Sequence, residues 1–172
     1  KDIDDFTSLD SFDFFKIPSV EFQNKALRNT LLNTGKDVLL STGCQNENEI
    51  REVINDLLSK KNWTLLHCIS NYPLAIRNSK LGYLNHLSKI CGRRVGYSSH
   101  DEYWENCLIA ATLGASIIER HITLSKDSIG LDHSSSSDIN EFKRLNYFLK
   151  SIPLILSGDF DRSLNQGELL NK

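Results

Sequence analysis

The sequence predicts an α/β protein with a parallel sheet, built from about five βα units. Short apolar runs rich in strand-forming residues recur along the chain, at 14–17, 38–42, 64–68, 95–100 and 116–121. Helix-length stretches separate them, and parallel strands need connections of a dozen or more residues, usually helical. Each run also ends on reactive or polar side chains. In a (β/α)8 barrel the active site lies at the carboxyl ends of the strands, so we expect a barrel with its pocket at this edge.

The first two connections carry helix signals. Residues 24–33 are predicted to form a short helix that ends near Gly35, because glycine adopts the left-handed C-cap conformation without a Cβ clash. Residues 46–60 place apolar side chains at helical spacing and give the clearest helix. Asn46, followed by Glu49 three residues later, is typical of an N-cap with a capping box.

The later connections follow the same pattern. Residues 79–90 place apolar side chains on one helical face, and Gly92 ends that helix. An alanine-rich helix is expected over 103–113, again ending at a glycine. A polar loop over 125–137 then leads to a last helix over 138–151. The alternation of strand and helix therefore extends through most of the chain.

The length and composition fit a single domain. The chain has 172 residues, of which 40% are hydrophobic, enough for one sizeable core. A formal net charge of -2 without a basic stripe argues against nucleic-acid binding. No run approaches the ~18 apolar residues of a membrane span, and the acidic first residues do not fit a signal peptide. We therefore expect a cytoplasmic protein that binds neither nucleic acid nor membranes.

Further features concern how much of a barrel is present. The sequence lacks methionine and begins at Lys1, from which we expect an excised piece of a longer protein. A full (β/α)8 barrel takes about 250 residues, whereas five units fit the present length. We assign residues 1–156 to a partial barrel and the polar residues 157–172 to a linker. The four cysteines form no CxxC pair, so reduced thiols are expected.

Histidines follow the last two predicted strands. His100 and His121 end successive runs, and adjacent strands lie about 4.8 Å apart, so the two imidazoles are placed to share a divalent ion. Two histidines leave open positions for water or oxygen ligands, as a catalytic metal requires. The alternative is that each histidine satisfies a strand-end hydrogen bond. Glu119 lies two residues before His121 and shares its face, whereas Arg120 should point away.

The other strand ends suit an anion. Lys16 lies within an apolar run, which fits an anion clamp or a Schiff-base lysine; the alternative is a lysine that snorkels from a strand end. Residues 41–43, 70–71 and 98–99 offer hydroxyls, an amide and backbone N–H groups to a phosphate or carboxylate. Each of these segments alone is also an ordinary helix-capping signal.

Six side chains from the strand ends are expected to converge on one pocket: Lys16, His67, Ser98, His100, Glu119 and His121. A nucleophile–base pair of His67 and Cys68 is discounted, because neighbours on a strand point to opposite faces. Asp132 lies in the loop after the last predicted strand and is a further candidate for the site. The alternative is that it is an ordinary loop residue in contact with solvent.

Seven motifs resemble, in order and spacing, the sialic acid synthase family. Within residues 14–142 they are Lys16-Ile17-Pro18-Ser19, Leu40-Ser41-Thr42-Gly43, Leu66-His67-Cys68, Asn71-Tyr72-Pro73, Gly96-Tyr97-Ser98-x-His100, Ile118-Glu119-Arg120-His121-Ile122-Thr123-Leu124 and Asp132-His133. This NeuB-like family includes the N-acetylneuraminate, legionaminate and pseudaminate synthases, which have a TIM barrel followed by a small antifreeze-like domain. The resemblance implies that the chain holds strands 4 to 8 of that barrel. Residues 157–172 would then lead towards an absent antifreeze-like domain.

The resemblance also implies a transferase activity. The reaction would be a phosphoenolpyruvate-dependent condensation with an N-acetylmannosamine-like sugar, an N-acyl-amino hexose, which yields a nonulosonic acid and phosphate. In the family pattern His100 and His121 bind Mn²⁺ or a similar ion, which polarises the sugar aldehyde. The full-length protein would be a homodimer.

The remaining roles carry over from matching positions. The catalytic candidates are Lys16, Glu21 and Glu119. The candidates for binding substrate are Lys16, Ser19, Thr42, Asn71, Tyr72, Ser98 and Asp132. Within these sets, phosphate and carboxylate would be held by Lys16, Ser19, Asn71 and Ser98. The glutamates would orient water, metal or substrate, and Asp132 would bind sugar hydroxyls.

Two positions depart from the family pattern. Ser99 stands where the family usually has Asp, and Cys44 stands where Met is common, but neither change removes a proposed ligand. Because the first three strands and the antifreeze-like domain are missing, we expect weak or no activity from these residues alone, with an open sheet edge. One alternative is a non-catalytic half-barrel that binds anions or complements a separate N-terminal half. Another is a different TIM-barrel enzyme, such as a Schiff-base aldolase that uses Lys16.

Overall fold

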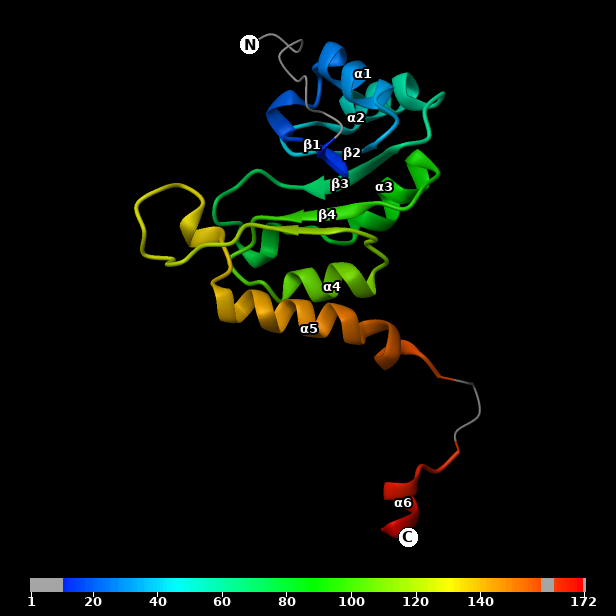
Figure 1. The fold of residues 1–172 in the computed structure, drawn as a ribbon, viewed down its shortest axis with the longest axis vertical. Helices are drawn as coiled ribbons and strands as arrows, with labels where there is room; N and C mark the ends of the chain where they lie inside the picture. Colours follow the sequence, from blue (N-terminus) through cyan, green and yellow to red (C-terminus); the bar gives the residue numbers. More distant parts are fainter. Residues whose placement is uncertain (1–10, 159–162, 172) are drawn as a thin grey trace.

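The computed structural model describes residues 11–158 and 163–171 of the chain. One five-stranded parallel sheet has the order β1-β2-β3-β4-β5, so each strand pairs with its neighbours in sequence (Figure 1). The strands are β1 Phe14–Ile17, β2 Asp37–Ser41, β3 Trp63–Cys68, β4 Gly96–Ser99 and β5 Ile118–Arg120. The helices are α1 Lys25–Asn33, α2 Glu47–Leu57, α3 Tyr83–Cys91, α4 Asn106–Thr112, α5 Ile139–Leu156 and α6 Gln166–Leu170. The predicted series of five βα units is confirmed.

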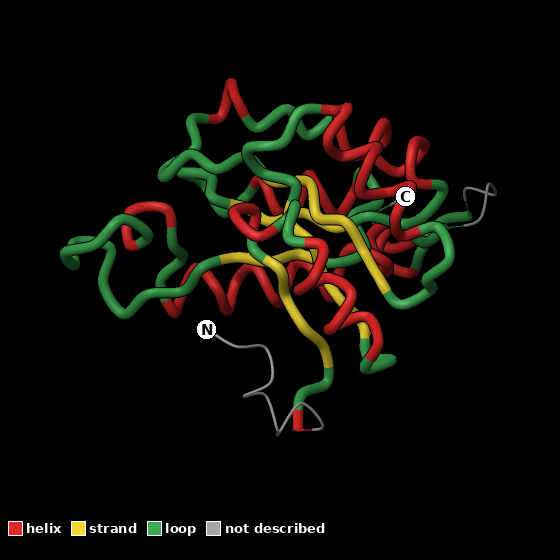
Figure 2. The backbone as a smooth tube through the Cα atoms, turned by 90° about the horizontal axis from the view of Figure 1, so that it is seen from above, coloured by secondary structure: helices red, strands yellow, loops and turns green. Residues whose placement is uncertain are grey.

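An ion pair shows how strongly the sheet curves. The outer strands β1 and β5 are four strand spacings apart, which in a flat sheet would be about 19 Å. Yet Lys16 Nζ on β1 lies 2.9 Å from Glu119 Oε2 on β5. The strands therefore curl around a concave face, as the view from above shows (Figure 2), and they form half of a parallel barrel.

Side chains alternate between the two faces of this curved sheet. The outward positions are mostly apolar and pack against the helices; they include Ile17, Val38, Leu40, Leu65 and Tyr97, all at most 1% exposed. Because the strand period is two residues, the intervening positions face the concave side. The apolar face thus holds the helices, and the other face is left for a site.

Capping residues account for most helix boundaries. Asn46 and Glu49 form the predicted capping box of α2, whose buried side chains are Ile50, Val53, Ile54 and Leu57. Helix α3 ends at Gly92, whose φ of 65° is in the left-handed region. This helix begins later than predicted, at Tyr83, because the left-handed φ of 45° at Lys80 interrupts the helical backbone after a separate 3-10 turn, Ile76–Asn78.

The C-terminal part departs further from the prediction. Helix α5 continues past residue 151 to Leu156 and includes Pro153, since a proline removes one hydrogen bond and can kink a helix without ending it. Within residues 157–172, the predicted linker, the structure describes the short helix α6, capped by Asn165. No helix in the described residues has the length and apolarity needed to cross a bilayer. All four cysteines are free.

Candidate active site

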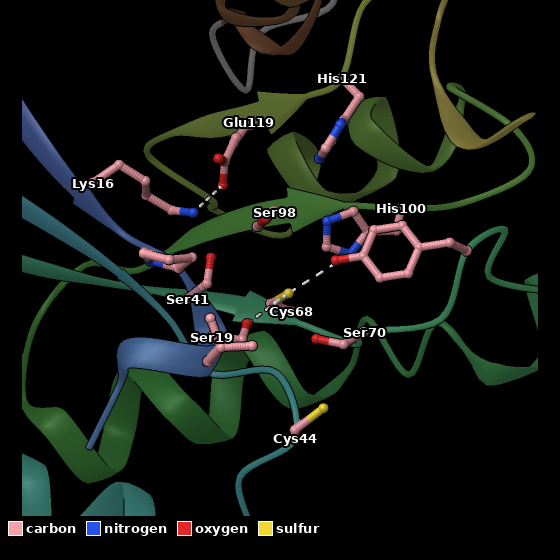
Figure 3. A pocket seen from close by; sticks show the side chains of 13 residues that line it. Lys16, Ser19, Ser41, Cys44, Cys68, Ser70, Ser98, His100, Glu119 and His121 are labelled. Carbon is pink, nitrogen blue, oxygen red and sulfur yellow. Dashed lines mark hydrogen bonds and ion pairs between the residues drawn. The ribbon is translucent and has the colours of Figure 1, made fainter. Parts of the chain in front are cut away.

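A cavity of about 560 Å³ lies at the carboxyl ends of the strands, on the concave face (Figure 3). Every strand or the loop after it contributes to the lining: Lys16, Ser19, Ser41, Cys44, Cys68, Ser70, Tyr72, Ser98, His100, Glu119 and His121. Five of the six side chains expected to converge do so. His67 is the exception.

Strand register explains this convergence. Ser98 is the Cα partner of Glu119, and Ser99 is the partner of Arg120. Partners on neighbouring strands share a face, so Ser98 and Glu119 point into the cavity while Ser99 and Arg120 point away. The predicted orientation of Arg120 is confirmed by its hydrogen bonds, because its Nε donates to Ser137 Oγ at 3.1 Å.

His67 points towards the helices, and its expected place in the pocket was wrong. Its Nε2 lies 3.0 Å from Ser79 O, and its ring stacks on Tyr97 at 5.7 Å between centroids. Burial lowers the pKa of His67, so the ring is held neutral among apolar neighbours. Alternation along β3 then brings the next residue, Cys68, to the cavity side.

A lysine and several hydroxyls line the cavity, as expected of a site for an anion. Lys16 is ion-paired with Glu119, and the two side chains keep 25% and 35% of their surface exposed. Ser41 is 2% exposed, and no described residue hydrogen-bonds its Oγ. Ser19 Oγ accepts from Gly43 N at 3.1 Å. A buried hydroxyl that lacks a protein partner retains bonding capacity for a ligand.

Gly43 brings the loops after β1, β2 and β3 close together. A Cβ at this position would lie 2.6 Å from Ser19 Oγ and closer still to Ser70 Oγ. Both hydroxyls belong to the cavity wall. The absence of a side chain at residue 43 therefore allows these two serines to approach the same point.

The two imidazoles face each other across the end of the cavity. The ring centroids of His100 and His121 lie 5.3 Å apart, and the Tyr72 ring lies 4.2 Å from that of His100. His100 Nδ1 lies 3.1 Å from Ile69 O. Because a carbonyl only accepts, Nδ1 carries the proton and Nε2 offers its lone pair, an arrangement typical of metal-binding histidines.

The surroundings of His121 favour the same chemistry. Burial and the nearby His100 lower the pKa of His121, which favours the neutral ring that binds a metal. Asp132 Oδ2 lies 3.8 Å from His121 Nδ1. Among the described residues no three His, Cys, Asp or Glu side chains lie close enough to form a metal site by themselves. The two imidazoles are therefore the ligands that the described residues offer, and a divalent ion bound there would take its other ligands from water or substrate oxygens.

Cys68 is a cavity residue that the sequence analysis did not place there. Its Sγ lies 3.8 Å from His100 Nδ1 and 3.5 Å from Ser19 Oγ. Burial raises the pKa of this thiol, but hydrogen bonds with His100 and Ser19 outweigh burial and leave the pKa below its ordinary value. Burial alone lowers the pKa of His100, yet its contacts with Cys68 and Ile69 O raise it overall, so a metal ion at Nε2 would compete with a proton there. Cys68 is the register partner of Ser98 and shares its face, and this pairing across strands is not given by the sequence alone.

Four predicted site residues lie outside the cavity lining. Thr42 Oγ1 donates to Leu66 O and lines a neighbouring cavity of about 360 Å³. Glu21 accepts from Asn24 Nδ2 at 2.7 Å near the start of α1. Asn71 is exposed in the loop after β3, and the Asp132 side chain is 57% exposed.

Comparisons with known proteins agree with this architecture. The family model described as "NeuB family" matches residues 2–159. The chain belongs to the NeuB family. This finding confirms the resemblance to sialic acid synthases that the motifs indicated.

Named NeuB relatives are similar over most of this chain. N,N'-diacetyllegionaminic acid synthase of Campylobacter jejuni is 35% identical, over 91% of this chain and 48% of that protein. N-acetylneuraminate-9-phosphate synthase of Drosophila melanogaster is 30% identical, over 87% of this chain and 42% of that protein. The chain thus spans about half the length of these relatives.

A solved structure extends the comparison to the fold. The N-acetylneuraminic acid (sialic acid) synthetase of Leptospira borgpetersenii, in complex with citrate, superposes with a TM-score of 0.83 at 26% identity. The match covers 99% of this chain and 61% of that one. A truncated 3-deoxy-D-arabino-heptulosonate 7-phosphate synthase of Thermotoga maritima shares the fold, with a TM-score of 0.66 at 22% identity. These matches confirm the partial-barrel assignment.

Proposed function

We propose that this chain supplies the anion- and metal-binding half of a cytoplasmic synthase that condenses phosphoenolpyruvate with an N-acetylmannosamine-like sugar to form a nonulosonic acid. One observation carries the proposal: a lysine, a buried hydroxyl and two imidazoles from different strands line a single cavity. A cavity of about 560 Å³ is also large enough for a small anion beside a sugar.

Phosphoenolpyruvate would bind at the β1 and β2 side of the cavity. Lys16 offers a positive charge, and Ser19, Ser41 and Ser98 offer hydroxyl donors to the phosphate and carboxylate. In the structure Lys16 Nζ lies 2.9 Å from Glu119 Oε2. Binding of the anion to Lys16 would weaken or break this ion pair. The freed Glu119 carboxylate would then orient water and accept its proton. Asn71 remains a candidate through movement of the exposed loop after β3, and Thr42 remains one only if its bond to Leu66 O breaks.

The sugar would bind at the β4 and β5 side. We assign the two metal ligands to His100 and His121, with Mn²⁺ as the expected ion. When bound, such an ion supplies Lewis acidity that polarises the aldehyde of the open-chain sugar. Tyr72 would cover the site, and Asp132 would accept hydrogen bonds from sugar hydroxyls. Glu21 is assigned a more distant role in orienting substrate or water.

In the proposed reaction the C=C π electrons of phosphoenolpyruvate form a bond from its methylene carbon to the aldehyde carbon of the sugar, whose C=O π bond opens to an alkoxide that takes up a proton. Water adds at the resulting cationic C2 and gives a proton to Glu119. The tetrahedral intermediate then collapses: the bond from C2 to the phosphate oxygen breaks, phosphate leaves, and the added hydroxyl loses its proton to become the C2 carbonyl. Because the chain spans about half the length of its relatives, we expect weak or no turnover by this chain alone and full activity in a longer homodimeric form.

A second candidate is a non-catalytic half-barrel that binds anions or complements a separate N-terminal half. The sheet order favours this candidate. Within the described residues, β1 pairs only with β2 and β5 pairs only with β4, so each has one edge without a strand partner. Such free edges are sites for pairing with further strands.

Phosphate release distinguishes these candidates. It would be measured with phosphoenolpyruvate, N-acetylmannosamine and Mn²⁺ for this chain and for a version extended through upstream codons, each beside a His100→Ala control. We expect release by the extended version that its control abolishes. Release restored by an N-terminal half supplied in trans would support the complementing half-barrel.

Borohydride trapping tests the remaining alternative, a Schiff-base aldolase. A stable adduct after borohydride treatment with pyruvate would indicate a Schiff-base lysine.

A further inference from the structure

The two imidazoles lie just beyond the ladder between β4 and β5. The last register pair is Ser99 with Arg120, one residue before His100 and His121. Beyond that pair the two strands no longer bond each other through the described backbone. The backbone oxygen of His100 accepts from Leu74 N in the loop after β3, and that of His121 accepts from Ser137 N in the loop before α5. The ladder therefore does not fix the distance between the two rings.

On the outer face of the sheet, the guanidinium of Arg120 links β5 to the segment that carries His100. Its Nη1 donates to Ser99 Oγ at 3.0 Å and to Asp101 O at 2.7 Å. These two residues flank His100, whereas Arg120 itself is the neighbour of His121 in sequence. Across the part of the chain that is described, no other side chain hydrogen-bonds from β5 to the residues beside His100.

Further hydrogen bonds hold Asp101, one of the two residues that accept from Arg120, in place. Asp101 is fully buried, and its Oδ1 accepts from Ser79 Oγ and Asn106 Nδ2, both at 2.8 Å. Its Oδ2 accepts from Ser99 Oγ at 2.7 Å, the same hydroxyl that Arg120 contacts. A guanidinium suits this task because its planar fork addresses several acceptors at fixed angles, which a lysine cannot do.

Arg120 also keeps one donor unused. It is 8% exposed, and in the described residues its buried Nη2 finds no acceptor. An unpaired buried donor lowers stability. The side chain is therefore not arranged to maximise stability alone, which is consistent with a geometric role.

We propose that Arg120 is a positioning residue that sets the spacing of His100 and His121 for one shared divalent ion. The inference rests on the proposed function, because it takes these two histidines as the ligands. Arg120 acts from the face opposite the cavity, so it touches neither the ion nor the substrate.

Metal affinity tests the inference without any need for turnover. Mn²⁺ would be titrated into this chain and into Arg120→Lys, with free Mn²⁺ followed by electron paramagnetic resonance. We expect binding to weaken by about ten- to a hundredfold, the usual effect of losing a group that orients a metal-binding histidine. The visible spectrum of the Co²⁺-saturated variant should also change, because the ligand geometry changes.

Arg28→Lys is the matched control. Arg28 is 3% exposed and donates to Phe22 O and to the Asp56 carboxylate, and none of these three residues lines the cavity. This variant should lose thermal stability to a similar extent while Mn²⁺ affinity and the Co²⁺ spectrum stay unchanged. If Arg120→Lys does not fold, Ser99→Ala removes one of the two bridges with a smaller packing change and should weaken Mn²⁺ binding several-fold.

The outcomes separate this inference from the proposed function. If the natural chain binds Mn²⁺ and both Arg120→Lys and Ser99→Ala bind it equally well with an unchanged Co²⁺ spectrum, the positioning role is wrong and the metal site stands. If the natural chain binds neither ion, the metal site of the proposed function fails, and the role of Arg120 fails with it.

Discussion

The two faces of the sheet at the strand ends differ in how completely their polar groups are bonded. On the outer face the Asp101 carboxylate accepts hydrogen bonds from Ser79, Tyr97, Ser99 and Asn106. On the concave face the buried Ser41 Oγ has no acceptor or donor among the described residues, and Lys16 meets Glu119 across an open cavity. The Asp101 carboxylate thus uses its bonding capacity for the fold, although the neighbouring Arg120 keeps one N–H unpaired, whereas the Ser41 hydroxyl on the concave face retains its capacity for a ligand.

The largest effect on stability is expected from Asp101→Ala. The change leaves several buried donors without an acceptor, so the free energy of unfolding should fall by about 3–5 kcal/mol. Urea denaturation followed by circular dichroism measures this loss. Asp132→Ala, at a carboxylate that is 57% exposed, should change the same quantity by less than ~0.5 kcal/mol. Equal losses in the two variants would contradict the contrast between the faces.

A smaller loss is expected from Gly43→Ala, at the meeting point of three loops. The added Cβ would overlap Ser19 Oγ and Ser70 Oγ, so we expect a loss of about 1–3 kcal/mol together with weaker anion binding. Gly82→Ala is the control, because no atom lies within 4 Å of its added Cβ. A Gly43→Ala protein as stable as the natural chain would show that the serine loops move apart easily.

Local signals in the sequence account for what could be predicted. The α2 helix is specified by its own apolar spacing and by the Asn46 capping box, both of which lie within a few residues. Alternation along a strand likewise predicted that Arg120 points away from Glu119 and the cavity. These features depend on neighbours in sequence, so no knowledge of tertiary contacts was needed.

Long-range packing decided the rest. Alternation requires His67 and Cys68 to face opposite sides, but it does not say which one faces the cavity. That choice follows from the contacts of His67 with Tyr83 and Tyr97, which come from different elements. The position of Asn71 depends in the same way on a loop conformation, for which short motifs carry little information. Thr42, by contrast, follows Ser41 at the end of β2 and bonds Leu66 O, so the same alternation turns it away from the cavity.

Ser41→Ala should separate ligand binding from stability. Removal of a buried hydroxyl that lacks a protein partner should leave the free energy of unfolding within ~0.5 kcal/mol of the natural value, or raise it. Loss of a hydrogen bond to a charged ligand should weaken phosphoenolpyruvate binding roughly tenfold in calorimetry. Ser116→Ala is the converse control, since Ser116 Oγ donates to Val95 O outside the cavity lining. It should lower stability by about 1 kcal/mol with unchanged binding.

The smallest effect concerns the pH dependence of folding, which the outer face should control through His67. Burial, the largest influence, lowers the pKa of His67 in the folded chain, while the unfolded value is about 6.5. Between these two values the unfolded state binds more protons, so stability is complete above about pH 6.5 and falls as the pH drops towards the folded pKa.

His67→Phe keeps an aromatic ring against Tyr83 and Tyr97 and removes the titration. The absolute stability should fall, because Ser79 O loses its partner. The difference in unfolding free energy between pH 7.5 and pH 5.5 should nevertheless shrink, by up to about 1 kcal/mol. Urea titrations at the two pH values measure that difference. If His67→Phe shows the same difference in unfolding free energy between the two pH values as the natural chain, groups on the cavity face must cause the loss of stability in acid. The concave face would then contribute to folding as well as to ligand binding.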